Sequence, residues 1–147
     1  MTKLTPHFTT EEFCASQTAS RLGIDNSLPI DLVENAKRTC EGLESVRIIL
    51  NANVIHVSSG YRCKKLNDAV GSKDTSQHLK AQAADILCPA FGSPAHVMHA
   101  IVNSALNYDQ CLLEFADKGG GWVHISFSDN PRKQALIVGS HGTRDYV

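Results

Sequence analysis

The sequence predicts an α+β fold in which a mainly antiparallel sheet has the N-terminal helices packed against it. Helical patterns dominate the first half of the 147 residues, and strand patterns dominate the end of the chain. The length suits one domain with its own hydrophobic core, and neither a low-complexity segment nor an internal repeat marks a boundary. Residues 1–147 are therefore expected to form a single domain.

The first half of the chain is predicted to be mainly helical. Thr9 and Glu12 fit a capping box at the start of a short helix. A longer helix is expected to begin at Pro29, which suits a first helical turn. Its apolar residues recur with the helical period and predict a stripe that covers a sheet: Val33, Ala36, Cys40, Leu43, Val46 and Leu50.

Strand patterns begin after this helix. Residues 54–58 are rich in β-branched side chains, which favour a strand. Residues 66–70 predict a short helical turn that ends at Gly71. Residues 83–87 form a second predicted strand, small and apolar around one acid, Asp85.

The last part of the chain is expected to be mostly β structure after one more helix. That helix starts at Ser93 and is expected to reach about Asn107. Residues 110–115 and 122–127 predict a hairpin, because a glycine-rich segment joins them. Residues 135–138 are expected to add an edge strand, and the tail after them has no readable pattern.

Charge and composition exclude several classes of partner. The 14 Lys and Arg residues balance 15 Asp and Glu residues at a formal net charge of −1, so no nucleic-acid partner is expected. No apolar run approaches the roughly 20 residues of a membrane span, so no membrane insertion is expected. The N-terminal stretch MTKLTPHFTTEEF lacks the apolar segment of a secretory signal, which predicts synthesis in the cytoplasm. The five cysteines form no C-x-x-C pair, so reduced thiols are expected rather than a cysteine zinc site.

The predicted hairpin brings an acid and a histidine to one face of the sheet. Alternation along the two strands places the apolar side chains on one face and both Glu114 and His124 on the other. A loop centred near Gly119 would even make them cross-strand neighbours.

His78, Asp85 and His124, with Glu114 beside them, form a candidate catalytic site. Two imidazoles and one carboxylate are a common ligand set for catalytic zinc, with the fourth position left for water. A carboxylate that is not a ligand, here Glu114, can accept the proton of that water. The pattern alone also allows a structural alternative, in which Asp85 is a satisfied core acid, His78 lies at the surface and His124 is an ordinary strand residue.

The segments around these residues resemble those of a known family. SQHLKAQAAD at 76–85 is similar to the S-x-H-x-x-G-x-A-x-D signature of zinc D-alanyl-D-alanine peptidases. WVHIS at 122–126 resembles their second histidine motif, and SGYR at 59–62 resembles the segment before the first. The family includes bacterial carboxypeptidases and phage endolysins, and its fold is shared with the hedgehog domain and lysostaphin-type enzymes. The lead-in, FTTEEF at 8–13 and NSLP at 26–29, resembles the short phage-related branch, so the resemblance spans roughly residues 8–127.

The resemblance implies a role for each matching residue. His78, Asp85 and His124 would be the zinc ligands. Arg62 would orient a carbonyl or carboxylate of the substrate, which suits the rigid fork of donors on a guanidinium. Ser76 would support the ligand loop or bind substrate. Trp122 is expected to line the substrate cleft, with simple packing at the strand end as the alternative.

The chain departs from the family pattern at two places. The signature glycine is Ala81, which is tolerated if the position needs no positive φ. Many relatives carry the catalytic acid just before the last histidine, where this chain has three glycines at 119–121. Glu114, in a segment that resembles the Q-L-I-x-E-F of the phage-related branch, is the expected substitute, with Asp109 in reserve.

The function expected from these features is that of a monomeric, endolysin-like zinc peptidase. It would cut stem or cross-link peptides of peptidoglycan, acting on the cell wall after release from the host cytoplasm. Which bond is cut stays open among a D-Ala-D-Ala carboxypeptidase, an L-Ala-D-Glu endopeptidase and a cross-link endopeptidase. The alternatives are a non-catalytic hedgehog-like zinc domain that binds wall peptide, and a metal-free virion or wall-binding protein.

Overall fold

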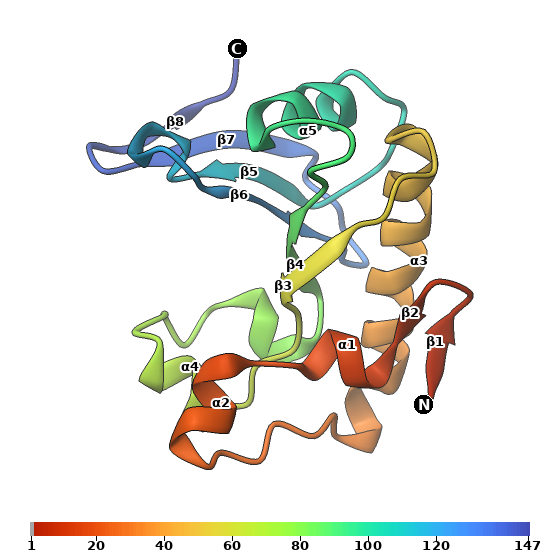
Figure 1. Cartoon of the computed structure of the whole chain (residues 1–147), viewed down its shortest axis with the longest axis vertical. Helices are drawn as coiled ribbons and strands as arrows, with labels where there is room; N and C mark the ends of the chain where they lie inside the picture. Colours follow the sequence, from red (N-terminus) through yellow and green to blue (C-terminus); the bar gives the residue numbers. More distant parts are fainter. Residues whose placement is uncertain (1) are drawn as a thin grey trace.

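The computed structural model describes residues 2–147 and confirms an α+β fold built on a six-stranded sheet (Figure 1). The N-terminal part forms a two-stranded sheet and the first helices: β1 (Lys3–Thr5), β2 (Phe8–Thr9), α1 (Thr10–Cys14), α2 (Gln17–Leu22), the 3-10 turn η1 (Ile30–Leu32) and α3 (Val33–Ile49). The later helical segments are α4 (Lys64–Ala69), η2 (Gln77–Lys80), α5 (Pro94–Val102) and η3 (Ala116–Lys118). The strands of the main sheet are β3 (His56–Ser59), β4 (Ala83–Leu87), β5 (Gln110–Glu114), β6 (Trp122–Ser126), β7 (Gln134–Gly139) and β8 (Gly142–Asp145).

The main sheet is mostly antiparallel, as predicted. Its strand order is β3-β4-β6-β5-β7-β8, and only β5 and β7 pair in parallel. The predicted hairpin is the β5–β6 pair, and the predicted strand at 83–87 is β4. Strand β4 pairs with β6 and not with β5, which follows it in the sequence. The middle of the sheet therefore combines segments from two distant parts of the sequence.

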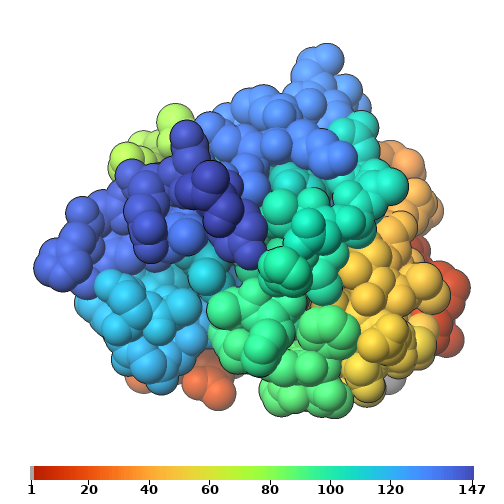
Figure 2. Space-filling view, turned by 90° about the horizontal axis from the view of Figure 1, so that it is seen from above, coloured from red at the N-terminus to blue at the C-terminus, as the bar shows by residue number. Residues whose placement is uncertain are grey.

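The core lies between this sheet and the helices α3 and α5 (Figure 1). The predicted stripe of α3 is buried from Ala36 onward, whereas Val33 is only partly buried, and α5 contributes Val97, Met98 and Ile101. Helix α3 comes close to the end of β6, because a Cβ at Gly42 would lie only 2.3 Å from the ring of Phe127. Figure 2 shows the helix-covered side, with α5 between α3 and the C-terminal hairpin.

The predicted length of the helix at Ser93 is wrong, because α5 ends at Val102 instead of near Asn107. Asn103 caps the helix: its backbone N–H and its side-chain amide both donate to the His99 carbonyl. The hydrogen bond from the Asn103 side chain is of the local kind that competes with helix continuation. The chain is then free to turn toward β5.

The predicted edge strand at 135–138 is also placed wrongly, since β7 lies inside the sheet. The outer strand is β8, which pairs with β7 across a turn between Gly139 and Gly142. All four residues of β8 are exposed and polar or small, GTRD, so the tail lacks the apolar alternation that marks a strand. The small β1–β2 sheet and helix α2 were likewise not predicted, although Ser16 caps α2 and Gly23 ends it with a left-handed φ of 66°.

None of the helices within residues 2–147 combines the length and apolar character that crossing a membrane requires.

Candidate metal centre and active site

Two of the predicted metal ligands face each other on adjacent strands. Asp85 lies in the middle of β4 and is paired with His124 of β6. Its neighbours Ala84 and Ile86 point into the core, so alternation along the strand turns Asp85 to the opposite face. Asp85 is nevertheless only 9% exposed. The acid in this apolar strand therefore points into a covered site, not into open solvent.

The third predicted ligand, His78, reaches the same face from the η2 turn. Ser76 begins the turn and accepts the backbone N–H of His78 on its hydroxyl at 3.3 Å. The backbone N–H of Arg62 donates to the His78 carbonyl. From α3, the hydroxyl of Thr39 donates to the carbonyl of Ala81 at 2.8 Å, which fixes the end of the turn.

The condition under which Ala81 would replace the signature glycine without cost is not met, because the position has a positive φ. Ala81 ends η2 in the left-handed conformation, with φ 56° and ψ 30°, and its N–H donates to the carbonyls of Gln77 and His78. A left-handed φ costs an L-residue about 1–2 kcal/mol relative to glycine. The methyl group of Ala81 is fully buried in the core, and this burial offsets part of the cost.

The three side chains meet closely enough to share one metal ion. Asp85 Oδ1 lies 3.3 Å from His78 Nε2 and 3.0 Å from His124 Nδ1. One ligand atom from each residue lies within 4.8 Å of the others. Ligands about 2.1 Å from a tetrahedral zinc ion are separated by about 3.4 Å, so these spacings suit zinc.

The protonation of His78 also suits a metal ligand. Its Nδ1 lies 2.6 Å from the carbonyl oxygen of Gly60, and a carbonyl can only accept a hydrogen bond. Nδ1 therefore carries a proton, and Nε2 is the ring nitrogen that faces Asp85 and that would bind a metal ion. A backbone carbonyl in this position is a common outer partner of metal-binding histidines, since it fixes both the tautomer and the ring.

Two imidazoles stabilise the negative charge of the Asp85 carboxylate. Burial alone would raise the pKa of Asp85, but the hydrogen bonds and charges of His124 and His78 outweigh burial and hold the pKa well below its usual range. Asp85 is therefore a carboxylate at neutral pH, as a metal ligand must be.

Glu114 lies beside this cluster without joining it. Its Oε1 is 3.9 Å from His124 Nδ1, too far for a hydrogen bond. The indole N–H of Trp122 donates to the same Oε1 at 2.9 Å and holds it in place. Burial raises the pKa of Glu114, an effect that the positive field of His124 only partly opposes.

The register of the hairpin differs in detail from the expected one. Glu114 is opposite Trp122, and His124 is opposite Leu112, so Glu114 and His124 are diagonal rather than direct neighbours. The reason lies in the turn, where the short η3 segment and three glycines take up the residues between the strands. Both side chains still lie on one face of the sheet, because Glu114 is two residues along β5 from Leu112, the residue opposite His124.

An open cleft of about 940 Å³ contains the three candidate ligands together with Glu114, Arg62, Ser76 and Trp122. Arg62 is half-buried and donates from Nη2 to the Ser76 hydroxyl at a long 3.4 Å. Its Nε is buried without a hydrogen-bond partner among residues 2–147. Arg62 also lines the cleft, so its guanidinium is placed to meet an acceptor supplied by a ligand.

Asp109, the reserve candidate for the base, is occupied elsewhere. Its two carboxylate oxygens accept from the backbone N–H, Nε and Nη2 of Arg132 and from the side-chain amide of Gln77. These hydrogen bonds lower its pKa to about 2, so the carboxylate is a poor proton acceptor.

The structural alternative for the site is wrong for His78, which is only 2% exposed. Two further histidines have positions or contacts that do not involve the candidate site. His56 lies exposed on the edge strand β3, and His96 caps its own helix by accepting the N–H of Ser93.

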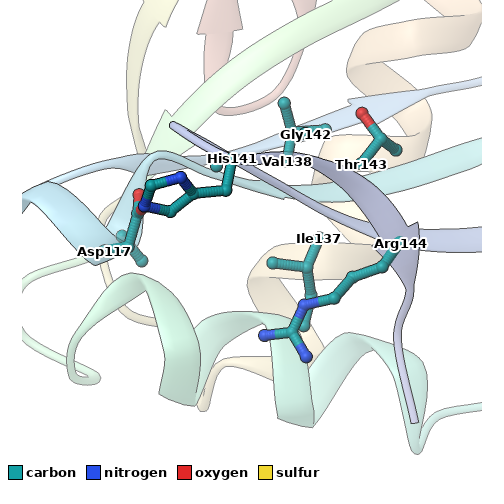
Figure 3. Close-up of a pocket in the computed structure, with 9 residues that line it drawn as sticks. Asp117, Ile137, Val138, His141, Gly142, Thr143 and Arg144 are labelled. Carbon is teal, nitrogen blue, oxygen red and sulfur yellow. The ribbon is translucent and has the colours of Figure 1, made fainter.

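A second hollow of about 320 Å³ lies between η3 and the β7–β8 hairpin (Figure 3). It is lined by Asp117 and His141, among others, and Figure 3 shows Ile137 and Arg144 at its side. The Asp117 carboxylate accepts the N–H and the hydroxyl of Ser140, which fixes the hairpin turn. None of the candidate ligands lies here, so the hollow does not extend the site.

Sequence patterns missed three contributors to the site. The Gly60 carbonyl carries no signal at all, because any residue has one. Thr39 lies on a helix 42 residues before its partner Ala81, and only the tertiary fold brings them together. Arg132 was overlooked because it follows the last strand with a clear pattern.

A family comparison agrees with this geometry. The model of the Peptidase M15 family matches residues 6–126. A comparison with curated proteins finds no match. The matched region contains all three candidate ligands, Arg62 and Glu114, and it covers most of the chain, which therefore belongs to the Peptidase M15 family.

Proposed function

We propose that the protein is a zinc-dependent peptidase that hydrolyses stem or cross-link peptides of peptidoglycan. The observation that carries this proposal is the meeting of His78 Nε2, Asp85 Oδ1 and His124 Nδ1 in one cleft, with an unliganded carboxylate beside them. Two imidazoles and one carboxylate leave a tetrahedral zinc ion one open position, which is the arrangement of catalytic rather than structural sites.

Glu114, Trp122 and Arg62 have separate roles in the proposed hydrolysis. Bound zinc would polarise the scissile carbonyl and make a water molecule acidic enough to lose its proton near neutral pH. Glu114 accepts that proton on a carboxylate oxygen and passes it to the leaving amine. Trp122 keeps Oε1 of Glu114 in position through its indole N–H. Arg62 lines the cleft and binds the substrate carbonyl or carboxylate through its guanidinium.

The peptidoglycan substrate is inferred from the resemblance to D-alanyl-D-alanine peptidases and phage endolysins. We propose further that the enzyme acts on the wall after release from the host cytoplasm, in the manner of an endolysin, and works as a monomer. A peptide substrate follows from membership of a peptidase family.

The competing hypothesis is a zinc domain that binds wall peptide without cutting it. The three glycines at 119–121, where many relatives have an acid, favour this hypothesis. It requires that Glu114 play no part in proton transfer, which makes Glu114 the residue to test.

The decisive experiment compares zinc content and solubilisation of purified peptidoglycan for the wild type, Glu114→Gln and Glu41→Gln. Glu41 lies exposed on α3 and serves as a matched control. We expect one zinc per chain in all three proteins. Hydrolysis should fall by about 10²–10⁴-fold in Glu114→Gln alone, the usual contribution of a general base.

Each other outcome has a distinct meaning. Zinc without hydrolysis in the wild type would favour the binding domain. Hydrolysis that survives in Glu114→Gln would remove the base role from Glu114. A wild-type protein that binds no zinc would overturn the proposal, and the metal-free alternative would then remain.

A further inference from the structure

Arg132 is a second arginine in the cleft, and the family resemblance does not account for it. It lies in the segment between β6 and β7, beyond the residues 6–126 that the family model matches. It nevertheless lines the same cleft as Arg62 and Lys73. Its side chain is 55% exposed and so is open to a ligand.

The guanidinium of Arg132 is held in a fixed orientation. Nε and Nη2 donate to the two oxygens of Asp109, each at 2.8 Å, in the bidentate arrangement that arginine and carboxylate favour. Asp109 is only 3% exposed, and Gln77 donates to it from the other side. A side chain held in this way loses little further freedom when it binds a ligand.

The contact with Asp109 uses only some of the N–H donors of the Arg132 guanidinium. The two hydrogens of Nη1 and the second hydrogen of Nη2 have no acceptor among residues 2–147. Donors of a fixed guanidinium that face a cleft match the two oxygens of a carboxylate.

The position of Arg132 relative to the candidate metal centre follows from the strand register. Asp109 precedes β5 directly, and Leu112, three residues later, is opposite His124. Three residues of a strand span about 10 Å. An extended peptide with its scissile bond at the metal centre would therefore reach Arg132 with a residue about two or three positions away.

The charges of the cleft also favour an acidic ligand. Arg62, Lys73 and Arg132 line it as cations, against the carboxylates of Asp85 and Glu114. A divalent zinc ion at Asp85 would make the net charge of the cleft clearly positive. Because Asp109 offsets the charge of Arg132, its contribution is expected mainly through directed hydrogen bonds.

We propose that Arg132 is a substrate-recognition residue that binds a carboxylate of the peptide, two or three residues from the scissile bond. This inference rests on the proposed function, since it assumes a peptide in this cleft. The carboxylate belongs either to a residue within the peptide, as a branch, or to the C-terminus of the peptide.

The first test changes the substrate and leaves the protein intact. The zinc-loaded wild type is given synthetic stem peptides with a free branch carboxylate, with the same group as a primary amide, and with an amidated C-terminus. We expect one of the two amidations to lower kcat/KM by about 10- to 150-fold, the range for a hydrogen bond to a charged group. The loss should appear in KM rather than kcat, because Arg132 is remote from the reacting bond. The amidation that has the effect identifies which carboxylate is bound.

The second test assigns this preference to Arg132. Removing Arg132 alone would leave the buried Asp109 unpaired and endanger folding. The double variant Asp109→Asn with Arg132→Gln keeps a polar pair without charge. Arg132→Lys keeps the charge but loses the fork, and Lys133→Gln, an exposed neighbour, serves as the control. We expect the preference to disappear in the double variant, to weaken in Arg132→Lys and to persist in Lys133→Gln.

Failure of this proposal can be distinguished from failure of the proposed function. Equal kcat/KM for all three peptides in the wild type would overturn the proposal while leaving the peptidase intact. A preference that persists in the double variant would assign the carboxylate to another residue and likewise overturn it. If no peptide is hydrolysed, calorimetry of the same peptides with the zinc-loaded protein still tests the preference. Tighter binding of the peptide with the free carboxylate would then support carboxylate recognition by Arg132, even though the proposed peptidase function had failed.

Discussion

The three glycines between β5 and β6 make different demands on the backbone, so alanine substitutions at each should have graded effects. Gly119 has a φ of +77°, and a Cβ there would meet nothing within 4 Å. Gly120 has open space around it and no positive φ in the left-handed range. Gly121 has a φ of +80°, and its Cβ would lie 2.4 Å from the carbonyl oxygen of Glu114.

These differences set the expected magnitudes. Gly120→Ala should leave stability unchanged or raise it by about 0.4–1 kcal/mol, because alanine restricts the unfolded chain. Gly119→Ala should lose about 1–2 kcal/mol to the left-handed conformation. Gly121→Ala should lose that amount and about 1–3 kcal/mol more, because its contacts are all backbone atoms and the strand ends must move apart.

Thermal unfolding of the three variants would measure this series. For a chain of this length, 1 kcal/mol corresponds to about 2–4 °C in Tm. We therefore expect little change or a small rise for Gly120→Ala, a fall of about 2–8 °C for Gly119→Ala, and about 4–20 °C for Gly121→Ala. A Gly121→Ala protein as stable as Gly120→Ala would refute the reasoning, since Gly121 would then not be held against Glu114.

Two further predictions concern the supports of the site. Thr39→Val should lower the free energy of unfolding by about 1–3 kcal/mol, because the buried carbonyl of Ala81 loses its donor, and an unchanged Tm would contradict this support. Hydrogen bonds from Arg132 hold the pKa of Asp109 at about 2, below its ordinary 3.8, so Asp109 contributes stability that is present above pH 3.8 and lost as the pH falls toward 2. Urea unfolding should show the advantage of the wild type over Asp109→Asn shrinking across that interval, whereas a constant difference would argue against the ion pair.

Patterns of near neighbours in the sequence predicted the fold well. The helical period of α3, the alternation in β5 and β6 and the apolar run of β4 each depend on burial of one side, and the structure confirms these elements. The errors fell where burial gives no pattern. The exposed strand β8 is held by backbone hydrogen bonds, which any sequence can make, and β1 and β2 are too short, at three and two residues, to show an alternation.

The site was predictable only as far as single strands and motifs determine it. Strand parity places Glu114 and His124 on one face, but their diagonal relation depends on the turn between them. The meeting of His78 with this pair depends on the β4–β6 register and on the η2 turn, which lie outside any local window. Resemblance to a family supplied the missing step, because its ordered motifs already encode that tertiary arrangement.

The glycine turn and the position of Glu114 are two aspects of one arrangement. At position 121 the backbone has a positive φ, and a Cβ would point into the carbonyl of Glu114, so an acid just before Trp122 is excluded by the turn itself. The same close approach pairs Glu114 with Trp122, whose indole N–H then holds the carboxylate near His124. An acid just before Trp122, in place of Glu114, would therefore require a different turn, and Glu114 would no longer be held near His124. On this reasoning, Gly121→Asp combined with Glu114→Gln should not restore hydrolysis, even if the protein folds and binds zinc.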